Sequence, residues 1–214
     1  YEWTSWGPVK FGNLHRVVIY ADNAKKASSI LPFTAYDSTK PEKLWAFLER
    51  YEHQTGGRVL AIPHNGNISN GEMFALPNNV PNPKYASNRS RWEPLFEVTQ
   101  IKGDSEVYPL LSPDDEFADY ETWKGWAGKD FTKEITEEEG VLRQREYARS
   151  GLKLGIQHQA ETGVNPFKFG MIGSTDSHSS FASASESNFW GKWAANEPGK
   201  DRLMGPLSDS WPVK

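Results

Sequence analysis

The chain has 214 residues, of which 5 are histidine, 9 are tryptophan and none is cysteine. This length fits one ordinary domain, and a hydrophobic content of 37% is sufficient for a packed core. The lack of cysteine excludes disulfides, thiolate zinc sites and cysteine nucleophiles, so any metal must be held by imidazole and carboxylate. A net charge of -4 without a basic block argues against nucleic acid as a partner, and no apolar run is long enough for a membrane span.

The first half of the chain predicts a strand, a helix and a second strand. Residues 17–20 form an apolar run typical of a strand. Thr39-Lys40-Pro41-Glu42 has the form of a capping box with proline in the first turn, and Gly56-Gly57 ends the helix that it begins. Residues 59–62 are apolar without alternation, which indicates a strand buried on both faces. A helix leading directly into such a strand favours a parallel sheet.

The second half repeats this order with a longer helix. Thr136-Glu137-Glu138-Glu139 predicts another capping box, and Gly163 predicts the end of that helix. One face of the helix is expected to consist of Val141, Arg145, Ala148, Leu152 and Ile156. Further strands are predicted at residues 95–99 and 167–172.

Two segments, 65–92 and 103–131, are rich in Asn, Pro, Asp and Gly and are predicted to be irregular. Loops of this length are uncommon unless they are functional or disordered. Met73, Phe74, Tyr85, Trp123 and Trp126 lie within them. We therefore expect packed loops around an active site.

Histidines and acidic residues fall where two predicted strands end. His64 follows the strand at residues 59–62, and Asp176 and His178 follow the strand at residues 167–172. Ligands in α/β folds gather at the carboxyl ends of parallel strands, so these side chains are expected at the same end of the sheet. The Asp-x-His spacing allows a carboxylate and an imidazole to reach one cation or two adjacent ones.

Glu2 and His15 are expected to join this site through a hairpin. If the first residues end a strand, the glycine- and proline-containing segment 7–13 can turn the chain back, and His15 then enters the strand at residues 17–20. Glu97 lies among apolar residues of the strand at 95–99 and needs a partner if it faces inward.

Structural interpretations of these residues stay open. Residues 174–176 have the composition of a helix cap, His64 is a polar residue at a strand end, and Glu97 is equally a hydrogen-bonded core carboxylate. His53 and His158 lie near the ends of predicted helices, where the helix dipole favours a cation, and we expect a structural role for both.

Five segments, in this order, resemble a bacterial family known as domain-of-unknown-function family 3604. They are Glu2-Trp3-Thr4-Ser5, Asn13-Leu14-His15-Arg16, Ile62-Pro63-His64-Asn65, Phe96-Glu97-Val98 with Lys102-Gly103-Asp104-Ser105-Glu106, and Gly173-Ser174-Thr175-Asp176-Ser177-His178. The motifs of that family are similar to those of the polymerase-and-histidinol-phosphatase (PHP) superfamily of metal-dependent phosphoesterases.

The resemblance implies an α/β fold of the distorted β/α-barrel type, with two or three divalent metal ions at the carboxyl ends of the strands. The implied metal ligands are Glu2, His15, His64, Asp176 and His178. Glu97 matches an acidic position that would orient a ligand, and Arg16 and Lys102 lie close enough in sequence to ligands to contact a phosphate or sulfate. Histidine and carboxylate ligands suit Zn²⁺, Mn²⁺ or Fe²⁺.

The implied function is hydrolysis of a small-molecule phosphoester, sulfate or phosphonate by metal-activated water. PHP proteins carry a His-x-His motif upstream of the bridging glutamate, and this sequence has none. We therefore expect a single PHP-like domain over residues 1–214 that lacks its first strands and has that upstream segment as a partner. The metal centre of this chain is then incomplete, and whether the chain hydrolyses esters without the upstream segment is left to experiment. Residues 179–214 are expected to be an irregular tail packed on this domain, and the resemblance favours a periplasmic or secreted protein.

A different class of function also fits the composition. Trp123, Trp126, Trp190 and Trp193 could stack on sugars or other rings, which would make the chain a non-catalytic, carbohydrate-type binding module. Core packing is the commoner role of such residues. The two classes differ in their expected response to a chelator, which would inactivate only the hydrolase.

Overall fold

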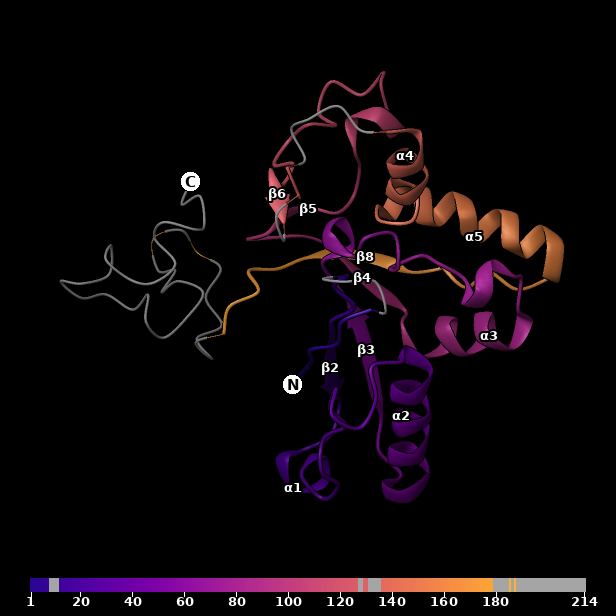
Figure 1. Ribbon diagram of the computed structural model, residues 1–214. Coiled ribbons are helices and arrows are strands. Elements are labelled where there is room, and N and C mark those ends of the chain that lie inside the picture. The colour runs from indigo at the N-terminus through magenta and orange to yellow at the C-terminus, as the bar shows by residue number, and fades with distance from the viewer. Residues whose placement is uncertain (8–11, 127–128, 131–135, 179–184, 186, 188–214) are drawn as a thin grey trace. The chain divides into compact units, whose positions relative to one another are not determined.

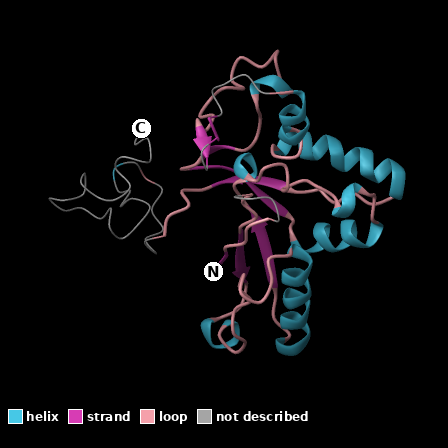
Figure 2. Cartoon of the chain, in the orientation of Figure 1, coloured by secondary structure: helices cyan, strands magenta, loops and turns pink. Residues whose placement is uncertain are grey.

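Short strands and helices joined by long loops make up the chain (Figure 2). The computed structural model describes residues 1–7, 12–126, 129–130, 136–178, 185 and 187. The chain divides into two compact units, Tyr1–Gly173 and Ser174–Lys214. Among the helices within the described ranges, none has both the length and the apolar character required to cross a membrane.

The first sheet of unit 1 is antiparallel and has the order β1-β2-β3 (Figure 1). Its strands are β1 (Glu2–Trp3), β2 (Arg16–Tyr20) and β3 (Val59–Pro63). The predicted hairpin is therefore present, with Trp3 opposite Arg16. The predicted parallel pairing of residues 59–62 is wrong, because β3 runs antiparallel to β2. Ala21 N–H donates to the carbonyl of Arg58 at 2.9 Å, so the segment 21–58, which connects the two strands, begins and ends at the same end of the sheet. The chain therefore returns along β2 in the opposite direction.

The second sheet has the order β5-β4-β8 and contains the expected parallel pair. Strand β4 (Leu95–Gln100) pairs parallel with β8 (Gly170–Gly173) and antiparallel with the short β5 (Gly103–Asp104). A third sheet joins β6 (Gly125–Trp126) to β7 (Lys129–Asp130). These small sheets form no closed barrel within the described residues, so the chain is of mixed α/β class.

Helix α2 (Pro41–Thr55) confirms the first predicted helix and packs beside β3 (Figure 1). Gly56 ends it in the left-handed conformation with φ of 62°, which glycine adopts without strain. The predicted capping box is wrong, because the N-cap is Lys40 and no side chain caps the helix. The hydroxyl of Ser5 instead donates to the backbone carbonyl of Thr39 at 2.8 Å.

The segment predicted to be irregular at 65–92 contains helix α3 (Pro83–Trp92). Asn82 is its N-cap and accepts a hydrogen bond from the Tyr85 N–H, and Pro83 occupies the first turn. An Asn-Pro step is a recognised helix start, but the surrounding Asn and Pro residues obscured it. Short 3-10 turns lie at Gly66–Ile68, Pro77–Asn79 and Pro109–Leu111, and a four-residue helix, α1, at Ala24–Ala27.

The long helix predicted from Thr136 to Gly163 is interrupted. It consists of α4 (Glu137–Arg143) and α5 (Ala148–Thr162), with the predicted capping box at Thr136 and the predicted end at Gly163 both confirmed. The break occurs because other loops engage its polar groups: Phe74 N–H donates to the carbonyl of Arg145, and the Glu146 carboxylate accepts from Gly71 N–H.

The predicted face of this helix is only partly buried: Ala148 is 0% exposed, but the ends of the face are not covered. Val141 and Ile156 are 52% and 66% exposed. The buried side of α5 is instead made of small residues and one histidine, namely Ala148, Ser150, Gly151, Gly155 and His158. A Cβ at Gly151 would lie 2.9 Å from the Phe74 ring, so the glycine permits close packing of α5.

Two apolar clusters form the core of unit 1. One packs α2 against the first sheet and contains Trp3, Val18, Leu44, Trp45 and other buried side chains. The other lies around Phe74, Phe96 and Phe167 and packs α5 against β4. Met73 and Phe74 are 0% and 2% exposed, as expected for packed loops.

Candidate metal centre

The first sheet has one face that packs against α2, called the core face, and one that α2 leaves uncovered, called the open face. Side chains on the open face can still be buried, as His64 is at 1% exposed. Residues that lie opposite each other in an antiparallel pair point to the same face, and neighbours along a strand point to opposite faces. On the core face lie Trp3, Arg16, Val18 and Ala61, all buried. The alternate positions, which include Glu2, His15 and His64, therefore belong to the other face.

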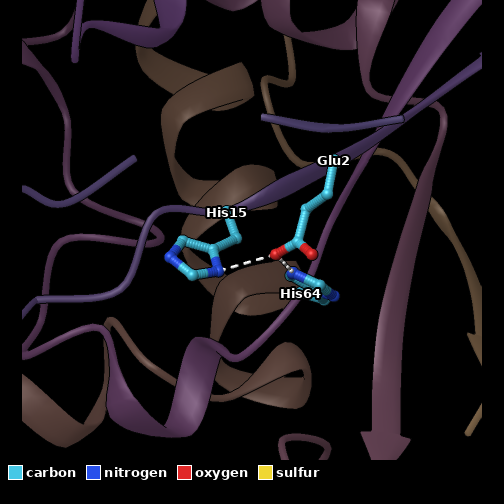
Figure 3. Close-up of side chains that lie close together, drawn as sticks. All are labelled: Glu2, His15 and His64. Atoms are coloured by element: carbon cyan, nitrogen blue, oxygen red, sulfur yellow. Dashed lines mark hydrogen bonds and ion pairs between the residues drawn. The ribbon is translucent and has the colours of Figure 1, made fainter. Parts of the chain in front are cut away.

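On that face Glu2, His15 and His64 come together (Figure 3). A single oxygen, Glu2 Oε1, lies 2.7 Å from His15 Nδ1 and 3.2 Å from His64 Nε2. Each residue comes from a different strand or strand end: Glu2 is in β1, His15 precedes β2 and His64 follows β3. His64 N–H also donates to the His15 carbonyl at 3.3 Å, which extends the β2–β3 pairing to the two histidines.

The charges in this cluster depend on one another. Burial favours the protonated form of Glu2, but the hydrogen bonds from His15 and His64 and their charge outweigh burial and hold its pKa well below the ordinary value. Burial is the chief cause that lowers the pKa of His15. Burial also opposes the charged form of His64, but Glu2 and Glu97 outweigh it and raise the pKa of His64 to about 8. Without a metal, His64 is thus the cation that balances the glutamate.

Glu97 lies behind His64 and is 4% exposed. Its Oε1 is 3.6 Å from His64 Nδ1, the ring nitrogen on the side away from Glu2. This distance is too long for a hydrogen bond but places a carboxylate where it can orient the ring. Glu97 is thus buried beside the His64 ring, and its orienting role stays a prediction.

Lys102 lies in the turn between β4 and β5 and is 6% exposed. Its charge contributes to the lowered pKa of His15, so its ammonium group acts on the cluster electrostatically. A chain of side chains holds the turn in place: the Gln100 amide donates to Asn65 Oδ1, and Lys102 N–H donates to Gln100 Oε1 at 2.9 Å. Asn65 directly follows His64, so this chain links the lysine turn to the histidine.

Asp104, in β5, is expected to make stability depend on pH. Burial raises its pKa to about 6 from the ordinary 3.8, against hydrogen bonds from the Glu106 and Val107 N–H groups. The folded state therefore holds a proton that the unfolded chain releases. Its contribution to the free energy of unfolding is largest below pH about 4, falls as pH rises to about 6, and is constant above that.

We expect Asp104→Asn to remove this dependence, which amounts to about 1 kcal/mol after allowance for partial exposure. Urea denaturation of both proteins between pH 4 and 7 measures the difference. Parallel stability curves for the two proteins would contradict the assignment to Asp104.

Arg16 lies on the other face of the sheet from His15. Its guanidinium is 1% exposed, with Nε 3.0 Å from Glu93 Oε1. It also donates to the carbonyl of Leu14. Arg16 is thus part of a core ion-pair network, and adjacency in sequence to His15 does not bring its charge to the open face.

Asp176 and His178 lie in the second unit, Ser174–Lys214. Asp176 has a positive φ of 54°, and His178 Nδ1 is 2.8 Å from the Asp176 carbonyl oxygen. The Asp176 carboxylate is 3.8 Å from the same nitrogen. These two residues therefore share one tight turn, as the Asp-x-His spacing predicted.

The remaining predicted residues have separate locations. His158 is buried in α5, where Nδ1 is 2.8 Å from the Val164 carbonyl and Nε2 accepts from Asn82 N–H, and His53 is exposed on α2. Trp123 is half-buried, the side chain of Trp126 is not described, and Trp190 and Trp193 lie outside the described residues, as does nearly all of the predicted tail at 179–214. Trp6, which the sequence interpretation did not single out, lies beside His15 with ring centroids 5.0 Å apart.

The three side chains of unit 1 fit a metal ion. One ligand atom from each of Glu2, His15 and His64 lies within 4.8 Å of the others. Ligands about 2.1 Å from a tetrahedral ion are about 3.4 Å apart. The 3.2 Å between Glu2 and His64 is close to this spacing, whereas the 2.7 Å between Glu2 and His15 is a hydrogen-bond distance that would have to lengthen around an ion. Two histidines and a glutamate are also a known donor set for zinc. The buried His15 Nε2 has no hydrogen-bond partner among the described residues, whereas Nδ1 donates to the Glu2 carboxylate at 2.7 Å.

Comparison with known proteins gives one family. A family model described as "Protein of unknown function (DUF3604)" matches residues 1–209. The matched range includes all five predicted metal ligands. No curated protein matches the chain, and no solved structure does.

Proposed function

The chain belongs to the DUF3604 family, and we propose that it is a metal-dependent hydrolase of phosphoesters or of related sulfate or phosphonate esters. The observation that carries the proposal is the approach of His15 Nδ1 and His64 Nε2 to one oxygen of Glu2. Separate segments of the sequence supply these groups, at β1, before β2 and after β3.

Glu2, His15 and His64 would hold a divalent cation of the Zn²⁺, Mn²⁺ or Fe²⁺ type. Such an ion, when bound, polarises an ester oxygen and lowers the pKa of water to about 7. Asp176 and His178 stay predicted ligands, and this prediction rests on the family resemblance alone. The expected number of two or three ions has the same basis. We also propose that the chain is related to the PHP superfamily and that it forms part of a barrel of PHP type.

The protein side chains have distinct tasks in this proposal. Glu97 orients the imidazole of His64, because it lies next to Nδ1 and is itself buried. Lys102 stays a predicted contact for the anionic group of the substrate, and its positive charge also lowers the pKa of His15. Arg16 has no task at the site, since its guanidinium is bound to Glu93 in the core.

Metal content and hydrolysis, measured together, test the proposal. The full chain is incubated with Zn²⁺ or Mn²⁺, desalted and examined by elemental analysis, and then assayed with 4-nitrophenyl phosphate and 4-nitrophenyl sulfate. We expect about one or more ions per chain, and hydrolysis that a chelator abolishes and added metal restores. Metal content at background level in both preparations would overturn the proposal, and the aromatic binding module would then be the function to test.

A further inference from the structure

The first six residues alternate between buried and exposed side chains. Trp3 and Ser5 are both 0% exposed, whereas Thr4 is exposed and Trp6 is 42% exposed. An extended chain places alternate side chains on opposite faces. Trp6 therefore shares a face with Glu2, the carboxylate of the candidate metal centre.

The hairpin register places His15 between these two residues. Glu2 lies opposite Val17, and an isolated bridge pairs Trp6 with Asn13. The same register places Thr4 opposite His15, so Glu2 and Trp6 are its two diagonal neighbours on that face. Both contacts are present: Glu2 Oε1 is 2.7 Å from His15 Nδ1, and the Trp6 ring is 5.0 Å from the His15 ring at an angle of 82°.

Trp6 differs from other tryptophans of unit 1 in its exposure. Trp3, Trp45 and Trp92 are 0%, 1% and 6% exposed and belong to the core. At 42% exposed, the indole of Trp6 keeps part of its apolar surface in contact with solvent, and aromatic surface of this kind stacks on planar groups. Its position beside a metal-ligand histidine gives this surface a specific neighbour.

We propose that Trp6 contacts the substrate and selects esters whose alcohol part is a planar aromatic or heteroaromatic ring. This inference rests on the proposed hydrolase function and adds a substrate class to it. One imidazole separates the Trp6 ring from the Glu2 carboxylate. A ligand whose anionic group lies at Glu2 and His64, and whose ring is attached to that group, is long enough to reach past the His15 imidazole to Trp6.

Binding of two phosphonates tests the inference without turnover. Phenylphosphonate and methylphosphonate carry the same anionic group, and neither contains the ester bond that the proposed reaction cleaves. Isothermal titration of the Mn²⁺-loaded full chain is expected to give about three- to tenfold tighter binding of phenylphosphonate, the range expected for one aromatic pair. Quenching of tryptophan fluorescence by phenylphosphonate provides a second readout.

Two variants and one control locate the preference. Trp6→Ala is expected to bring the ratio of the two affinities close to one, and Trp6→Phe to retain most of the preference for the phenyl compound. Tyr36→Ala removes an aromatic side chain that is 103% exposed on another loop and should leave the ratio as in the wild type.

The outcomes separate this inference from the function on which it rests. If both phosphonates bind the wild type equally, or if Trp6→Ala keeps the preference for the phenyl compound, the inference is wrong and the hydrolase proposal stands. If neither phosphonate binds the metal-loaded chain, both are overturned.

Discussion

Replacement of His64 by alanine is expected to weaken the binding of Zn²⁺ or Mn²⁺ by more than the roughly 10- to 100-fold that is typical for loss of an outer-shell partner. His64 supplies Nε2 at 3.2 Å from Glu2 Oε1, and its side chain is 1% exposed. Without this imidazole, unit 1 retains one histidine and one carboxylate of the three-residue cluster. The dissociation constant is measured by competition with a chromogenic chelator.

Because His64 is buried, a second variant keeps this test independent of folding. Glu2→Gln preserves the shape of a half-buried side chain and removes the charge that both histidines contact. It should show a similar loss of metal affinity with an unchanged circular dichroism spectrum. His53→Ala, on the exposed surface of α2, is the matched control and should bind metal like the wild type.

The order of effects is also informative. Glu97→Gln should lower metal affinity by about tenfold, since Glu97 orients His64 without contacting the ion. Wild-type affinity in both His64→Ala and Glu2→Gln would show that this cluster is a hydrogen-bonded structural feature.

Replacement of Glu93 by alanine is expected to lower the free energy of unfolding by about 3–5 kcal/mol. Glu93 Oε1 accepts hydrogen bonds from Arg16 Nε at 3.0 Å and from Trp45 Nε1 at 2.8 Å. Its other oxygen is 3.1 Å from Arg89 Nε. The carboxylate and both guanidinium groups are buried, so its removal leaves two positive charges in the core without their shared anion.

Urea denaturation followed by circular dichroism measures this loss. The matched control is Glu52→Ala, which breaks an ion pair of 2.7 Å with the exposed Arg91 and should cost less than about 1 kcal/mol. If the free energy of unfolding of Glu93→Ala lies within about 1 kcal/mol of the wild-type value, the expectation is wrong. Water or a rearrangement would then balance the charges of the two arginines.

The same network gives a direction for acid sensitivity. Burial alone would raise the pKa of Glu93, but Arg16 and Arg89 outweigh it and hold the pKa below the ordinary value. Its stabilising contribution is therefore present above the ordinary carboxyl pKa and is lost as pH falls through the lower, folded-state value. Glu93→Ala should remove this part of the acid sensitivity.

Local signals predicted the elements whose cause is local. The glycine pair after residue 55 ended α2, and Thr136 with Glu139 formed the predicted capping box, because caps depend on a few neighbouring residues. The hairpin that brings Glu2 near His15 was also predictable, since a short turn between two extended segments leaves few alternatives.

Features that depend on distant partners were not predictable in this way. The interruption between α4 and α5 follows from the hydrogen bonds that Gly71 and Phe74 make with residues 145 and 146. Helix α3 begins at Asn82, in a segment whose composition resembles a loop. The role of Trp6 beside His15 depends on the register of the hairpin, which the residue pattern left open.

The residue types available for chemistry, the helix boundaries at Gly56, Thr136 and Gly163, and the hairpin that pairs Glu2 with His15 all follow from the residue pattern alone. Only the tertiary structure decided which face of each strand is open. His15 and Arg16 are neighbours in the chain, yet one contacts Glu2 and the other contacts Glu93 in the core. The physical reason is that successive side chains of a strand point to opposite faces, and the packing of α2 against one face leaves the other for the candidate metal centre.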